Sequence, residues 1–200
     1  MKIHMIEKNV QALGPFQRYA LWLQGCPFNC EGCIAPDARD VEGGKDVPVQ
    51  VLVQDILMQD VEGVTVSGGE PFFQAEELFK LIKSIKNKSD KGVIIFTGYE
   101  YERLNKDSNP SIQGILNHAD VLIDGEYIKA YDDGLSMRGS SNQRAIMLSN
   151  RYKQFFNESF GHRPRKTEIF VEKDVVKVVG IPDSESKKLI DSLAKRKIKH

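Results

Sequence analysis

Three cysteines that lie close together are the residues in this sequence best suited to chemistry. Cys26, Cys30 and Cys33 are the only cysteines among 200 residues, and their spacing is C-x3-C-x2-C. An odd, crowded set is a poor disulfide framework, and in a reducing compartment it indicates metal binding or catalysis. A compact loop with this spacing can direct three thiolates at one metal centre, and thiolate ligands select zinc or iron–sulfur clusters.

The number of cysteines favours an iron–sulfur cluster with one open iron. A structural zinc site is normally closed by four protein ligands, and none of the four histidines lies at finger-like spacing from the cysteines. Electron-carrier clusters use four cysteines, so a cubane held by three keeps one iron free to bind a substrate or cofactor. Structural zinc and inert thiols remain the alternatives.

A second candidate segment is Ser67-Gly68-Gly69-Glu70-Pro71, which follows the short apolar run 64–66. Its glycines let the backbone approach a ligand closely. The carboxylate of Glu70 can accept a hydrogen bond from an ammonium group or a hydroxyl. Taken alone the segment is a weak signal, because Gly-Gly turns at strand ends are common.

Predicted strands and helices alternate through the first two-thirds of the chain. The residue patterns predict strands over 19–24, 64–66, 93–96 and 121–123, and helices over 48–59, 76–86, 101–104 and 112–117. Strands separated by helices imply a parallel sheet, in which ligands bind beyond the carboxyl ends of the strands. Those ends carry the cysteine loop, Ser67 to Glu70, Thr97-Gly98 and Asp124-Gly125, so one rim is expected to hold the site.

The pattern changes after residue 126. Residues 130–145 are expected to form a polar loop, 167–171 and 175–179 a β-hairpin, and Pro182 to near Lys197 a helix. We therefore expect a core domain over 1–147 and a C-terminal extension, hairpin plus helix, over 148–200 that packs on the core.

Composition argues against nucleic acid and membrane partners. Lys+Arg and Asp+Glu both number 28, so no net field attracts polyanions, and hydrophobic residues make up an ordinary 40%. No apolar run approaches the roughly 20 residues of a membrane span, and the N-terminus lacks the features of a signal peptide. We expect a cytoplasmic protein.

The cysteine segment resembles the cluster motif of the radical S-adenosylmethionine superfamily. In that family the methionine part of the cofactor chelates the open iron of a [4Fe-4S] cluster, and the reduced cluster cleaves the cofactor to a 5′-deoxyadenosyl radical that abstracts hydrogen. Gly68-Gly69-Glu70 is similar to the family's GGE motif, which hydrogen-bonds the methionine amino group. The resemblance implies an α/β fold, a partial (β/α)6 barrel, here with the C-terminal hairpin and helix extension.

The resemblance also implies which residues act. The three cysteines would be the metal ligands and would be catalytic through the cluster. Many members carry an aromatic residue before the last cysteine, where this chain has Gly32, so the adenine contact is expected from Phe28 or Ile34. The implied cofactor-binding residues are Phe28, Ile34, Ser67, Gly68, Gly69, Glu70, Thr97 and Asp124. Thr97 and Asp124 are alternatively simple strand terminators, and Asp124 is also a candidate ligand for a monovalent cation.

Further segments narrow the resemblance to glycyl-radical activating enzymes. Gly14-Pro15 and Arg18 precede the cysteines as in that branch, although Phe16 replaces a frequent second glycine. Three strings are similar to the activating component of anaerobic ribonucleotide reductase, and the resemblance covers roughly residues 10–147. The strings are Thr97 to Tyr99, Val121 to Tyr127 and Arg138 to Arg144.

The leading hypothesis is a radical enzyme that activates a glycyl-radical enzyme such as anaerobic ribonucleotide reductase, reduced by a flavodoxin- or ferredoxin-type protein. One alternative is a radical enzyme that modifies a peptide or small molecule, which the unmatched residues 148–200 motivate. Another is a non-catalytic iron–sulfur or zinc protein, which leaves Ser67 to Glu70 unexplained.

Overall fold

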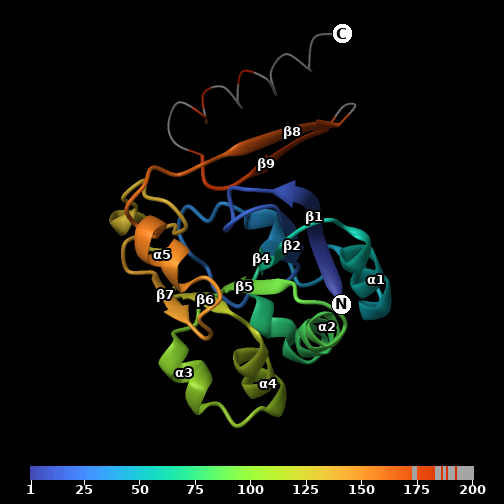
Figure 1. Ribbon diagram of the computed structural model, residues 1–200. Helices are drawn as coiled ribbons and strands as arrows, with labels where there is room; N and C mark the ends of the chain where they lie inside the picture. The colour runs from blue at the N-terminus through green and yellow to red at the C-terminus, as the bar shows by residue number, and fades with distance from the viewer. Residues whose placement is uncertain (173–174, 183–185, 187, 189–191, 193–200) are drawn as a thin grey trace.

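The computed structural model describes residues 1–172, 175–182, 186, 188 and 192 (Figure 1). The helix predicted from Pro182 to near Lys197 lies outside the described residues. Within the described ranges, no helix is long and apolar enough to cross a membrane.

A seven-stranded sheet with the order β3-β1-β2-β4-β5-β6-β7 forms the centre of the fold. The four central strands are parallel, and β1, β3 and β7 pair antiparallel at the two edges. The carboxyl ends of the parallel strands therefore meet at one rim, as predicted. The strands are β1 (Lys2–Val10), β2 (Arg18–Leu23), β3 (Lys45–Asp46), β4 (Gly63–Gly68), β5 (Gly92–Phe96), β6 (Val121–Asp124) and β7 (Arg144–Met147).

The first four helices of the chain cover one face of this sheet, and the fifth lies on the other face with Ile94 and Val121. Tyr19, Leu21 and Leu23 alternate along β2 and share one buried cluster with Leu78 and Ile82 of α2. Side chains at alternate strand positions point to the same face, so this cluster is the main core. The helices are α1 (Val49–Met58), α2 (Ala75–Lys88), α3 (Tyr101–Lys106), α4 (Pro110–His118) and α5 (Lys153–Ser159), with short 3-10 turns η1 (Pro36–Arg39), η2 (Pro71–Gln74) and η3 (Lys129–Tyr131).

The opposite face of the sheet is covered by the C-terminal part of the chain. Strands β8 (Glu168–Glu172) and β9 (Val175–Val179) form a separate antiparallel hairpin, which confirms the predicted one. Val179 is fully buried in a cluster with Val10 and Ala20. Figure 1 shows the hairpin beside β1, on the side of the sheet away from α2 and α4.

The other predicted elements are confirmed to within a few residues at their ends. The predicted polar loop over 130–145 is too long by two residues. Arg144 and Ala145 belong to β7, which pairs with β6. Strand β1 and helix α5 were not predicted. β1 mixes charged and apolar residues, and its extended form depends on pairing with β2.

Candidate cofactor site

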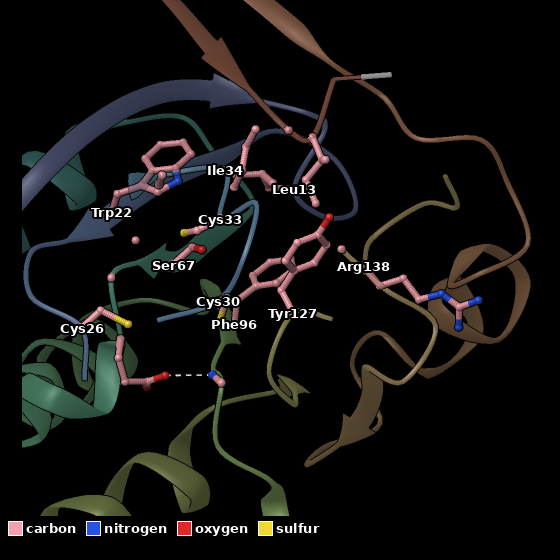
Figure 2. Close-up of a pocket in the computed structure, with 18 of the residues that line it drawn as sticks. Leu13, Trp22, Cys26, Cys30, Cys33, Ile34, Ser67, Phe96, Tyr127 and Arg138 are labelled. Atoms are coloured by element: carbon pink, nitrogen blue, oxygen red, sulfur yellow. Dashed lines mark hydrogen bonds between the residues drawn. The ribbon is translucent and has the colours of Figure 1, made fainter. Parts of the chain in front are cut away.

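A cavity of about 380 Å³ lies at the carboxyl ends of the parallel strands. This volume falls in the range of small-molecule sites. Its lining comes from the cysteine loop, the ends of β4 and β5, the loop after β6 and the C-terminal segment. In Figure 2 Cys26, Cys33 and Ser67 lie on one side of the view and Arg138 on the other, with Tyr127 between them.

The cysteine loop leaves β2 through a tight turn. Gly25 has a φ of +94°, a conformation that favours glycine, and its N–H donates to the carbonyl of Ala38 at 2.8 Å. The Cys26 N–H donates to the carbonyl of Arg39 at 3.2 Å, so η1 holds the start of the loop. All three cysteines are partly exposed and line the cavity.

The Gly68-Gly69-Glu70 segment is hydrogen-bonded directly to the start of the cysteine loop. The Gly69 N–H donates to the carbonyl of Leu23 and the Glu70 N–H to that of Gly25, each at 2.8 Å. A Cβ at position 69 would lie 2.2 Å from the Gly25 carbonyl oxygen. Glycine is therefore required here, because the two loops touch through their backbones.

The carboxyl group of Glu70 joins the ends of β4 and β5. The side chain is buried, and its Oε1 accepts from the Phe72 N–H and the Thr97 hydroxyl, both at 2.9 Å. Its Oε2 accepts from the Gly98 N–H at 2.8 Å. Burial raises the pKa of Glu70 to about 7, against the opposing effect of these donors.

The thiols of Cys26 and Cys30 are in an environment that favours their protonated form. Burial raises the pKa of Cys26 to about 11, the charges of Glu70 and the other cysteines add to this, and a hydrogen bond from the Phe28 backbone opposes it. Burial also raises the pKa of Cys30, helped by the charge of Glu126. Metal coordination removes thiol protons, so three thiols that face one cavity fit a cationic cluster.

The chemistry of the three cysteines fits a [4Fe-4S] cluster. Among the described residues, no three His, Cys, Asp or Glu side chains are grouped so as to hold one metal ion. A [4Fe-4S] cluster takes each cysteine on a separate iron, so its ligands need not converge on one point.

Seven of the eight predicted cofactor residues line the cavity. They are Phe28, Ile34, Ser67, Gly68, Gly69, Glu70 and Thr97. Asp124 is not among the lining residues. It is buried at the end of β6, where it pairs with Arg144 and accepts from the Tyr101 N–H at 2.8 Å. The next residue, Gly125, lines the cavity in its place.

The Phe28 ring lies directly over Gly98. A Cβ at position 98 would be 2.6 Å from Phe28 Cε2, so only glycine leaves room for the ring. Phe28 also makes an edge-to-face contact with Tyr99, with ring centroids 4.9 Å apart. These contacts fix an aromatic face at the cysteine end of the cavity.

The segment Arg138 to Arg144 is hydrogen-bonded to the loop that follows β6. Gln143 accepts from the Gly139 N–H and donates to the Gly125 carbonyl, both at 2.7 Å. Asn142 donates to the Glu126 carbonyl at 2.8 Å. The string thus holds the loop that carries Tyr127, a residue that lines the cavity with the three cysteines.

Several lining residues were missed by sequence reasoning. Leu13, Phe96, Tyr127, Met137, Val178 and Ile181 all face the cavity. Tyr127 lies in a string that the sequence already singled out, which was a usable signal. The others come from separate parts of the chain, with Phe96 at the end of β5 and Val178 in β9, and no local pattern marks them as site residues. Trp22 of β2 also lines the cavity.

Comparisons with known proteins agree with this geometry. Residues 12–146 match the profile of the family described as "4Fe-4S single cluster domain". The chain belongs to this family. The family profile includes all three cysteines and the Gly68-Gly69-Glu70 segment but ends before α5, β8 and β9.

Curated relatives fall into two kinds of activating protein. The anaerobic ribonucleoside-triphosphate reductase-activating protein of Enterobacteria phage T4 is 30% identical over 137 residues, covering 66% of this chain and 84% of that protein. Its counterpart in Vibrio cholerae is 30% identical over 141 residues, covering 65% and 87%. The pyruvate formate-lyase-activating enzyme of Clostridium pasteurianum is 32% identical over 140 residues, covering 66% and 55%.

These matches place the protein in the glycyl-radical activating branch of the radical S-adenosylmethionine superfamily. The resemblance inferred from the sequence is therefore confirmed. The predicted cofactors, a [4Fe-4S] cluster and S-adenosylmethionine, are supported by the same matches.

Proposed function

We propose that this protein activates a glycyl-radical enzyme, such as an anaerobic ribonucleotide reductase, by removing a hydrogen atom from a backbone glycine of that partner. When bound, the cluster and S-adenosylmethionine supply one-electron reductive cleavage and a radical that abstracts hydrogen. The observation that carries the proposal is the direct hydrogen bonding between the Gly68-Gly69-Glu70 loop and the start of the cysteine loop within one cavity.

Each part of the rim has a role in this proposal. Cys26, Cys30 and Cys33 hold the cluster and leave one iron open. Ser67 and the Gly68-Gly69-Glu70 backbone bind the methionine end of the cofactor.

Glu70 has one acceptor position left for an ammonium group. A carboxylate offers about four acceptor positions, and three of those on Glu70 are filled by Phe72, Thr97 and Gly98. The remaining position belongs to Oε2, and Glu70 lines the cavity. Glu70 thus orients the cofactor and also holds two strand ends in register.

Phe28 and Ile34 supply the contact with adenine. The Phe28 ring is held against Gly98 and Tyr99, and Ile34 is an exposed apolar side chain at the cavity rim. Thr97 and Asp124 act less directly: Thr97 holds Glu70, and Asp124 fixes the strand end that leads to Gly125.

The proposal also covers the type of fold, the division of the chain into two parts, and the partners. The sheet is taken as a partial (β/α)6 barrel of the radical S-adenosylmethionine type, with a core over 1–147 and an extension over 148–200 packed on it. Burial of Tyr152 and Val179 against the core supports this packing. We further propose a cytoplasmic enzyme, reduced by a flavodoxin- or ferredoxin-type protein, without nucleic acid or membrane partners.

The test is anaerobic reconstitution followed by two measurements. Dithionite-reduced protein should convert S-adenosylmethionine to deoxyadenosine, and a Cys30→Ser variant should not. With a glycyl-radical enzyme encoded in the same genome, the wild-type protein should produce a glycyl-radical signal by EPR. Deoxyadenosine without a glycyl radical on any such partner would contradict the proposal.

A further inference from the structure

The cavity extends beyond the part of the chain that matches the family. The C-terminal arm, defined here as residues 163–172 and 175–181, forms the wall that faces Tyr127 from the other side. Its lining residues are Arg165, Lys166, Val178, Gly180 and Ile181. The family profile ends at residue 146, so this wall is an addition to the shared site.

The first residues of the arm are tied to the loop before β7. Arg165 donates to the carbonyls of Arg138 at 3.2 Å and Gly139 at 2.6 Å. Its guanidinium also pairs with Asp132 at 2.7 Å and is nearly buried. Charge-assisted bonds of this kind are stronger than neutral ones, so this end of the arm is held firmly.

The hairpin anchors the rest of the arm. The Glu168 carboxylate accepts from the backbone N–H groups of Gln11 and Ala12, at 2.8 and 2.6 Å. Val179 is fully buried against Val10. The wall is therefore built into the fold at both ends.

The arm reaches the neighbourhood of the cysteine loop through Ile181. A Cβ at Gly139 would lie 2.8 Å from the Tyr127 ring and 3.5 Å from Ile181 Cδ1, so Gly139 lies between these two side chains. The Tyr127 ring in turn lies against the cysteine loop, because a Cβ at Gly32 would be 3.6 Å from Tyr127 Cε1. Ile181 is thus linked to the cysteine loop through Gly139 and Tyr127.

The two ends of the cavity differ in chemistry. The cysteine end carries polar and acidic groups, including Ser67 and Glu70, which suit the amino acid end of a cationic cofactor. The arm end carries the apolar side chains of Met137, Val178 and Ile181 beside Arg138, Arg165 and the exposed Lys166. Its two arginines are already paired, Arg138 with Asp133 and Arg165 with Asp132.

We propose that Val178 and Ile181 contact the substrate and restrict it to an uncharged, extended peptide segment of the partner protein. Apolar side chains disfavour a charged group that contacts them, because that group would lose hydration without gaining a partner, and the two arginines nearby are already paired. The inference rests on the proposed function and adds to it a specificity determinant that lies outside the shared family domain.

The test compares Val178→Ala and Ile181→Ala with Val171→Ala, an exposed position on the same hairpin. The initial rate of glycyl-radical formation is measured against partner concentration. Each of the first two variants should raise the KM for the partner about tenfold, since a few methylene groups in an apolar pocket discriminate at least that strongly. Ile181→Leu should restore most of the loss, and Val171→Ala should match the wild type.

Further measurements separate the possible failures. The Kd for S-adenosylmethionine should change less than about twofold in every variant, and a wild-type KM in both alanine variants would overturn the inference. A large loss of cofactor affinity with an unchanged KM would overturn it too, since the arm would then serve the cofactor. Absence of deoxyadenosine from the wild type would instead contradict the proposed function.

A crosslinking experiment covers the case in which the alanine variants do not fold. A benzophenone amino acid at position 181 of the reconstituted full chain should crosslink to the purified partner near its radical-bearing glycine. The same group at position 171 should not. Equal crosslinking from both positions, or none from 181, would overturn the inference.

Discussion

Arg18 offers the sharpest test of how this fold is held together. Its side chain is fully buried at the start of β2, opposite the cofactor rim. Its guanidinium donates to Thr65 Oγ1 at 2.6 Å, to a Glu62 carboxylate oxygen at 2.8 Å and to the Tyr152 hydroxyl at 3.0 Å. It also donates to the carbonyls of Val64 at 2.7 Å and Gly92 at 3.2 Å.

Replacing Arg18 with Met keeps the apolar stem and removes all of these donors. The Val64 and Gly92 carbonyls lose their side-chain donor, and each unsatisfied buried acceptor costs about 1–3 kcal/mol. Glu62 retains Arg151 as a partner, which limits the cost of its lost ion pair. We expect the free energy of unfolding to fall by about 4 kcal/mol, within the range for breaking a buried pair.

The Tyr152 hydroxyl bridges Arg18 and Glu62, so the effects of Arg18→Met and Tyr152→Phe should not add. Tyr152→Phe alone should cost about 1–2 kcal/mol. In a double-mutant cycle the coupling energy should be at least about 1 kcal/mol. Because Tyr152 lies after the family domain, this coupling measures how firmly the extension is joined to the core.

Urea unfolding of the reduced, cluster-free protein, followed by far-ultraviolet circular dichroism, gives these free energies. The matched control is Arg163→Met, an exposed arginine, which should change stability by less than about 0.5 kcal/mol. A loss below about 1 kcal/mol for Arg18→Met, or a coupling energy near zero, would refute the reasoning.

Three further predictions concern the site. Burial holds the pKa of Glu70 near 7, above its ordinary 4.5, so the folded state binds the extra proton. The stability advantage of wild type over Glu70→Gln should therefore shrink as the pH rises from about 5 to 8 in urea unfolding, and a growing advantage would contradict this. Cys26→Ser should lose most of the iron after reconstitution, measured by iron analysis and EPR; full iron retention would exclude Cys26 as a ligand. Gly98→Ala should displace the Phe28 ring and weaken S-adenosylmethionine binding several-fold by calorimetry, whereas unchanged affinity would exclude a Phe28 contact.

Most residues of the rim could be predicted from local patterns in the sequence. Apolar runs such as 93–96 and 121–123 predicted the parallel strands, because strands buried on both faces are continuously apolar. Motifs after those strands were then expected at one edge. Asp124 shows the limit of this logic: it ends a strand at the rim, yet its carboxylate turns to Arg144, a partner 20 residues away.

The sequence by itself determined the chemistry, because that depends on residue types at short spacing. Three thiols within eight residues, and a Gly-Gly-Glu segment after an apolar run, need no distant contact to be recognised. Only the tertiary structure decided the shape of the cavity. Its far wall exists because Glu168 binds the backbone of Gln11 across 157 positions, and Val179 is buried beside Val10. Such contacts leave no periodic trace in the sequence, since each is made once, between residues far apart in the chain.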